Sequence, residues 1–190
     1  MKTVLAPLFG LAAAGLAQAQ TAPAGQHLPR GTATDISNAE ILATAQKTAA
    51  APVSDQQIRV VSINGEYNVG VGVVHRAKTE GRDIGFGIEH SQITEIYHVI
   101  SGNGTFVTGG TIENMKETPA DSPVVTTLNG PSSGGGKVID GRTRKIGPGD
   151  VVIIPPNTPH WFTEITSDQI VYLVVRVDPH KVLPAGYGAK

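Results

Sequence analysis

The sequence predicts an all-β domain, a sandwich or barrel of short antiparallel strands. From Gln57 onward, apolar and polar residues alternate with a period of two, which places successive side chains on opposite faces of a strand. The 23 glycines and 13 prolines divide these runs into short segments, as is typical of sandwiches and barrels. Almost no helical pattern lies between the strands, so a parallel βαβ sheet is not expected.

A hairpin opens the strand region. Asn64-Gly65 lies between two alternating runs and predicts a tight turn, because both residues tolerate a positive φ. We expect Val69, Val71, Val73 and His75 to share one face of the strand that follows. Further strands are expected at residues 84–89, 94–100, 104–109, 142–146, 151–154, 159–166 and 170–177.

The first 19 residues are predicted to be a signal peptide. Lys2 supplies a positive charge, residues 4–16 form an uncharged apolar run, and Ala17-Gln18-Ala19 has the form of a cleavage site. The run is too short for a transmembrane helix, which needs about 20 apolar residues. We therefore expect cleavage after Ala19 and a periplasmic or secreted mature protein without membrane contact.

The rest of the 190-residue chain suits one domain. Its patterning predicts a flexible linker at 20–36, an N-terminal helix with its lead-in at 37–56, the strand domain at 57–177 and a C-terminal tail at 178–190.

The N-terminal helix has a local start signal. Residues 37–40, Ser-Asn-Ala-Glu, have the form of a capping box, in which two side chains satisfy free backbone N–H groups. We expect a helix over residues 38–49. Ile41, Leu42 and Ala45 fall on one stripe, so this helix is predicted to pack against the strand domain.

Residues 115–137 interrupt the strand pattern. Their prolines and the Gly134-Gly135-Gly136 run predict a long loop insertion. Loops of this length often act as lids, and a disordered surface insertion is the other interpretation.

Composition excludes several classes of function. Fifteen Lys and Arg residues against 16 Asp and Glu residues give a net charge of -1, so there is no basic field for nucleic acid. The chain has no cysteine, which rules out disulfides, thiolate metal sites and thiol nucleophiles. Any metal ion must be held by nitrogen and oxygen ligands.

Ionisable side chains lie on the predicted inner faces of two strands. Glu95 and Tyr97 share a face with the apolar Val99, and His160 shares one with Phe162. A buried carboxylate is costly unless it is paired or bound to a metal. Two imidazoles and one carboxylate form a facial triad that suits Fe, Mn, Ni, Cu or Zn and leaves positions open for substrate.

These segments resemble the two motifs of the cupin superfamily. The first motif is His-x-His, three or four residues, Glu, six residues and Gly. The second is Gly, five residues, Pro-x-Gly, two residues, His, three residues and Asn. The matching residues are His90, Glu95 and Gly102 in the first motif, and Gly149, Pro155 and His160 in the second.

Three positions depart from the family pattern. Ile88 stands where the first histidine is usual, Asn157 replaces a glycine, and Glu164 replaces the terminal asparagine. The resemblance then implies a reduced metal-ligand set of His90, Glu95 and His160. Two further histidines are candidates for the missing ligand. His75 shares its strand face with three valines, and His98 is expected on the face opposite Glu95.

The resemblance covers roughly residues 57–177 and implies a jelly roll, a double-stranded antiparallel β-helix closed into a barrel. Cupins include isomerases, dioxygenases, decarboxylases, lyases, sugar-binding proteins and storage proteins, so the fold alone does not define the reaction. The leading hypothesis is an exported, metal-dependent enzyme acting on a small organic molecule, with Tyr97 as a catalytic proton donor. The alternative is a small-ligand-binding cupin without metal. Cupins often pair through edge strands, which implies a homodimer.

Overall fold

The computed structural model describes residues 31–82 and 84–188. The predicted signal peptide and the first part of the predicted linker lie outside these residues. Among the described residues, no helix has the length and apolar character needed to cross a bilayer.

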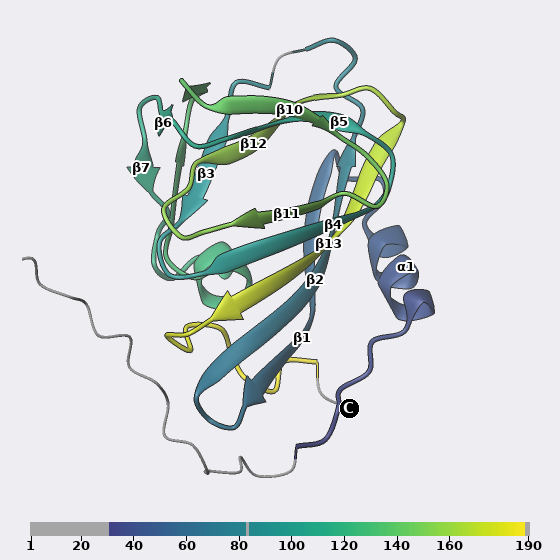
Figure 1. Ribbon diagram of the computed structural model, residues 1–190, viewed down its shortest axis with the longest axis vertical. Helices are drawn as coiled ribbons and strands as arrows, with labels where there is room; N and C mark the ends of the chain where they lie inside the picture. The colour runs from purple at the N-terminus through teal and green to yellow at the C-terminus, as the bar shows by residue number, and fades with distance from the viewer. Residues whose placement is uncertain (1–30, 83, 189–190) are drawn as a thin grey trace, which may run out of the picture. The chain divides into compact units, whose positions relative to one another are not determined.

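Two antiparallel sheets face each other (Figure 1). The first sheet has the strand order β1 (Val53–Ile63), β2 (Tyr67–Ala77), β13 (Gln169–Asp178), β4 (Thr94–Ser101) and β11 (Val151–Ile154). The second sheet has the order β10 (Arg142–Ile146), β5 (Gly104–Thr108), β12 (His160–Ile165), β3 (Gly87–His90), β8 (Ser132–Gly135) and β7 (Lys116–Glu117). The short strands β6 (Thr111–Ile112) and β9 (Val138–Ile139) pair with each other.

The chain crosses repeatedly between the two sheets, as a jelly roll requires. β3 lies in the second sheet, β4 in the first, β5 and β10 in the second, and β11, β12 and β13 then alternate. The expected closure into a barrel is wrong in one respect, because no hydrogen-bonded ladder joins the two sheets within the described residues. The domain is a jelly-roll sandwich whose layers are held together by side chains.

The core lies between the sheets, where side chains from both inner faces interdigitate. Across the layers, the ring centroids of Tyr97 and Phe106 lie 5.8 Å apart and those of Tyr172 and Phe162 lie 5.6 Å apart. Within each sheet, Tyr97 contacts Tyr172 at 4.5 Å and Phe106 contacts Phe162 at 4.7 Å. Other buried members are Val74, Val99, Ile146, Val152, Ile154, Ile165, Ile170 and Val174.

The hairpin between β1 and β2 turns where the sequence predicts. Asn64 and Gly65 have φ angles of 52° and 74°, the left-handed region that the turn needs. β1 begins at Val53, earlier than expected, and carries a bulge between Gln57 and Arg59.

Helix α1 (Asn38–Lys47) lies against the outer face of the β1–β2 hairpin (Figure 1). Its first turn is capped by Ser37, whose Oγ accepts a hydrogen bond from Glu40 N at 3.2 Å. The Glu40 side chain pairs with Arg59 at 2.7 Å and so does not complete the predicted capping box. Ile41 and Ala45 pack on the sheet, but Leu42 is 46 % exposed, so the predicted stripe is narrower than expected.

The segment 115–137 is not the long loop that its composition predicts. It contains β7, a π-helix, η1 (Val124–Asn129), and β8, which pairs with the edge of β3. An unpaired strand edge offers a row of backbone donors and acceptors, and this segment satisfies them despite its glycines. The predicted C-terminal tail is also packed, because the Asp178 carboxylate accepts hydrogen bonds from Val182 N and Leu183 N.

Candidate metal centre

The ends of three strands bring together His90, Glu95 and His160. His90 ends β3, Glu95 is the second residue of β4, and His160 begins β12. All three side chains are buried, and one ligand atom from each lies within 4.8 Å of the other two. The cluster includes both sheets, so the interior of the sandwich forms the site that the sequence predicts.

The separations suit a shared metal ion. Glu95 Oε2 lies 3.5 Å from His90 Nε2 and 3.4 Å from His160 Nε2. Two ligands placed about 2.0–2.1 Å from one ion in tetrahedral geometry lie about 3.3 Å apart. These two ligand pairs therefore have close to the spacing of a first coordination sphere.

Hydrogen bonds at the far side of the His90 ring set its tautomer. His90 Nδ1 lies 2.8 Å from Ser132 Oγ, and Ser132 Oγ donates to Gly130 O at 2.8 Å. Because the hydroxyl hydrogen is used for Gly130, Ser132 accepts from His90, and Nδ1 carries the ring proton. The Nε2 lone pair of neutral His90 then points at Glu95.

His160 is oriented in the same way. Its Nδ1 lies 2.9 Å from Thr158 O, a carbonyl that can only accept. Its Nε2 is buried and has no hydrogen-bond partner. Two imidazole lone pairs thus face one carboxylate oxygen, an arrangement that only a proton or a metal cation between them makes favourable.

Both carboxylate oxygens of Glu95 accept hydrogen bonds. Tyr97 OH donates to Oε2 at 2.9 Å, and Arg176 Nε donates to Oε1 at 3.1 Å. Burial by itself raises the pKa of Glu95. Attraction to His90 when that ring is protonated, hydrogen bonds from the protonated histidines and the charge of Arg176 outweigh burial and hold the pKa well below its usual value. Glu95 is therefore a carboxylate at neutral pH.

The pKa of His90 is also lowered, but here burial is the main cause. Burial lowers its pKa below the ordinary value, and the attraction of Glu95 only partly opposes this. A neutral imidazole beside an ionised carboxylate is the protonation state that metal binding needs.

Sequence reasoning missed the arginine behind the cluster. Arg176 on β13 is 1 % exposed and bridges Glu95 on β4 to Gln57 and Asp55 on β1. The available signal was an arginine on the face that the strand alternation gives to Tyr172 and Val174, inside a run of valines.

Asn157 takes the backbone role of the glycine that it replaces. Its φ of 56° lies in the left-handed region, which asparagine adopts more readily than most residues. Its N–H donates to His90 O at 2.8 Å and so ties the turn before β12 to the end of β3. Ile88 pairs with His160 in the ladder between these strands.

Neither candidate for the missing ligand reaches the cluster. His98 is exposed, on the face of β4 opposite Glu95 as predicted. His75 is buried, but it lines a pocket with helix α1 on the outer face of the first sheet. The inner face of β2 instead carries Val74 and Arg76. His75 therefore does not replace the histidine missing at Ile88.

Tyr97 is buried against the metal cluster, with its hydroxyl engaged by Glu95. Burial, and next the charge of Glu95, raise its pKa well above the usual value. The geometry gives Tyr97 a part in orienting the carboxylate, and its role in proton transfer stays a prediction.

The fold and the cluster define a jelly-roll protein with a candidate His–Glu–His metal centre. The sequence model of the cupin domain matches residues 133–176, which include the second motif and His160. This match, together with the jelly-roll fold, supports membership of the cupin superfamily.

Several solved structures are similar to the chain. A cupin protein from Bacteroides fragilis is 17% identical, with a TM-score of 0.37 over 64% of this chain and 75% of that chain. The DMSP lyase DddQ from Ruegeria pomeroyi is 17% identical, with a TM-score of 0.42 over 73% and 54%. Peruvianin-I, a cysteine peptidase from Thevetia peruviana latex, is 10% identical, with a TM-score of 0.41 over 68% of this chain and 63% of its own. No curated protein matches the chain.

Proposed function

We propose that this protein is an exported, metal-dependent cupin enzyme that acts on a small organic molecule, with His90, Glu95 and His160 as the metal ligands. The observation that carries the proposal is the pair of imidazole Nε2 atoms facing one Glu95 oxygen at 3.5 and 3.4 Å. Without a cation or a proton between them, the two imidazole lone pairs face this carboxylate oxygen unfavourably, although the oxygen also accepts a hydrogen bond from Tyr97.

The surrounding residues prepare the cluster for a divalent ion. Arg176 donates to Glu95 Oε1, so Oε2, which also accepts from Tyr97, is the oxygen that faces both histidines and would bind the metal. Ser132 and Thr158 fix the ring protons of both histidines on Nδ1. A divalent ion bound here would supply Lewis-acid or redox chemistry at the positions that the protein ligands leave open.

Metal content tests the proposal directly. We expect the desalted protein to retain about one equivalent of one of Mn, Fe, Ni, Cu or Zn, with Glu95→Gln and His160→Asn retaining almost none, because three-ligand sites depend on every ligand. Elemental analysis by mass spectrometry measures this. His98→Asn is the matched control, since it removes an exposed histidine from the same region. Equal metal retention in all four proteins, or none in the wild type after metal addition, would contradict the proposal.

One observation favours the second candidate, a small-ligand-binding cupin without metal. Arg176 already gives Glu95 a charged partner, so the carboxylate is partly compensated in the absence of an ion. In that case added Mn²⁺ or Zn²⁺ leaves the melting temperature unchanged. A bound metal raises it by mass action.

Export is the part of the proposal that rests on the N-terminal sequence. When the full chain is expressed in a Gram-negative host, we expect the intact mass of the periplasmic protein to correspond to a chain that begins at Gln20. Ala19→Arg places a bulky charge at the cleavage position and should leave the precursor uncut. Wild-type protein of full-length mass in the cytoplasm would disprove this prediction.

A further inference from the structure

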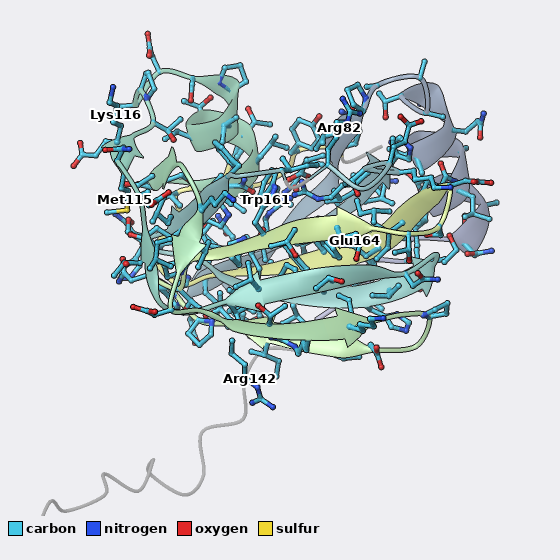
Figure 2. All side chains as sticks on the ribbon, turned by 90° about the horizontal axis from the view of Figure 1, so that it is seen from above. Arg82, Met115, Lys116, Arg142, Trp161 and Glu164 are labelled. Carbon is cyan, nitrogen blue, oxygen red and sulfur yellow. The ribbon has the colours of Figure 1, made fainter. Side chains whose placement is uncertain are left out.

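A cavity lies outside the metal cluster, where the end of β2 and the residues after it face β12. It has a volume of about 310 Å³. We name it the Arg76 pocket, and the residues that matter for its chemistry are Arg76, Lys78, Arg82, Trp161, Phe162 and Ile165. Figure 2 labels Arg82 and Trp161, which lie on the same side of the molecule. None of the three proposed metal ligands lines this cavity.

Arg76 is a buried cation that has no buried carboxylate as a partner among the described residues. It is 8 % exposed, and its Nε donates a hydrogen bond to Tyr172 OH at 2.9 Å. Its guanidinium lies 4.0 Å from the Trp161 ring centroid and 5.6 Å from that of Phe162. No carboxylate of the described residues forms an ion pair with Arg76, and Asp55, which influences it electrostatically, is engaged by Arg176.

The comparison with Arg176 shows that this is unusual within the same core. Arg176 is also buried, but it donates to two carboxylates and to an amide oxygen. A buried arginine without such partners carries a large desolvation cost. The terminal nitrogens of Arg76 therefore have donor capacity that a bound anion would use.

Trp161 supplies a second, independent donor. Its indole Nε1 is buried and has no hydrogen-bond acceptor in the described part of the chain. An indole N–H can only donate, and leaving it unsatisfied costs about 1–3 kcal/mol. The terminal nitrogens of Arg76 and the Nε1 atom of Trp161 are thus donors, on residues of one cavity, for which the described part of the chain shows no acceptor.

The rest of the lining defines the chemistry of that acceptor. Lys78 and Arg82 are exposed and add positive charge, and no Asp or Glu is among the described lining residues. Val53, Ile84, Phe162 and Ile165 give the cavity apolar walls. A small monocarboxylate with an apolar body fits both features.

We propose that the Arg76 pocket binds a small organic carboxylate, with Arg76 and Trp161 Nε1 as donors to the anion and the apolar walls around its body. This binding is independent of the metal centre and goes beyond the proposed enzymatic function.

The single tryptophan of the chain makes the test direct, because Trp161 is the only source of indole fluorescence. We expect benzoate, as the probe, to change the emission of the EDTA-treated full-length protein in a saturable way, with half-saturation below about 10 mM. Benzyl alcohol, which has the same ring without the charge, should bind at least tenfold more weakly. Because EDTA treatment removes any bound metal ion, this result does not depend on the metal proposal.

Variants locate the anion. Arg76→Gln should weaken benzoate binding at least tenfold, whereas Arg142→Gln, an exposed arginine that does not line the pocket, should leave it unchanged (Figure 2). Near-ultraviolet circular dichroism shows whether Arg76→Gln folds. If it does not, Arg82→Gln, which changes an exposed residue, replaces it as the test, and we expect benzoate binding to weaken about twofold to fivefold at low salt. No saturable response to benzoate, equal binding of benzyl alcohol, or unchanged binding in the folded variants of Arg76 or Arg82 would overturn the proposal.

Discussion

At the scale of single residues, the interior of this protein is defined by how buried charges are paired. Glu95 and Arg176 are both almost fully buried, and each is the other's partner. Asp55, which is partly exposed, takes the remaining charge of the guanidinium. Arg176, which is not among the proposed metal ligands, therefore adds to the effect of the histidines in keeping Glu95 ionised.

This pairing predicts a large effect of removing Arg176. We expect Arg176→Met to lower the free energy of unfolding by about 3–5 kcal/mol, because it leaves the buried Glu95 without its compensating charge. Urea denaturation followed by fluorescence measures the change. Arg59→Met is the control, since Arg59 pairs with Glu40 nearer the surface, where an ion pair contributes about 0.2–1 kcal/mol. Similar losses of unfolding free energy in both variants would show that the buried ion pair contributes no more to stability than the pair nearer the surface.

At the scale of elements, the metal cluster depends on the segment that precedes β8. The π-helix η1 ends at Gly130, which has φ 63° and ψ -164°, a conformation almost restricted to glycine. The carbonyl of Gly130 accepts from Ser132, and Ser132 accepts from His90. The turn between η1 and β8 thus reaches the metal cluster through two hydrogen bonds.

A methyl group at this turn should disturb both folding and metal binding. In Gly130→Ala the new Cβ would lie 2.7 Å from Val182 Cγ2, and we expect a loss of about 1–3 kcal/mol of stability with metal affinity lowered about tenfold or more. Urea denaturation and metal titration measure the two effects. Gly147→Ala is the control, because its nearest atom would be Asn103 Cβ at 3.8 Å. A change of under about 0.5 kcal/mol in both variants would show that the turn tolerates a side chain.

At the scale of the whole molecule, the sandwich encloses a polar cluster whose two main titrating groups respond to acid in the same direction. The folded-state pKa of His90 is lowered, so the unfolded chain takes up this proton first as the pH falls through about 6.5. The folded-state pKa of Glu95 is also lowered, so its contribution is complete above about pH 4.3 and is lost as the pH falls through the folded value. Both groups make the unfolded state bind more protons in acid.

Stability should therefore fall on acidification of the metal-free protein. We expect the free energy of unfolding to decrease from about pH 6.5 downward, first through His90 and then more steeply below about pH 4.3 through Glu95. Urea denaturation at a series of pH values gives the slope. Glu95→Gln should lose the second decrease and keep much of the first. Stability that rises as the pH is lowered from 6.5 would contradict the assigned directions.

Much of the fold was predictable because its signals are local. The period-two runs predicted seven of the strands after the hairpin (β3, β4, β5 and β10 to β13) with bounds close to those observed. Asn64-Gly65 marked the turn, and the spacing of His90, Glu95 and His160 matched the cupin motifs. The segment 115–137 was not predictable in this way, since its strands depend on pairing with the edge of β3 rather than on their own patterning.

The sequence by itself determined the strand pattern, the jelly-roll class and the three residues expected at the metal centre, because side-chain alternation and motif spacing depend on neighbours along the chain. Only the tertiary structure decided which face of β2 points into the core. Both faces of this strand carry apolar residues, because helix α1 packs against the outer face. The tertiary structure also decided that Arg176, 81 residues from Glu95, completes the cluster, while Arg76 faces a separate cavity. Buried charges find their partners across layers, and that pairing is set by packing between distant strands.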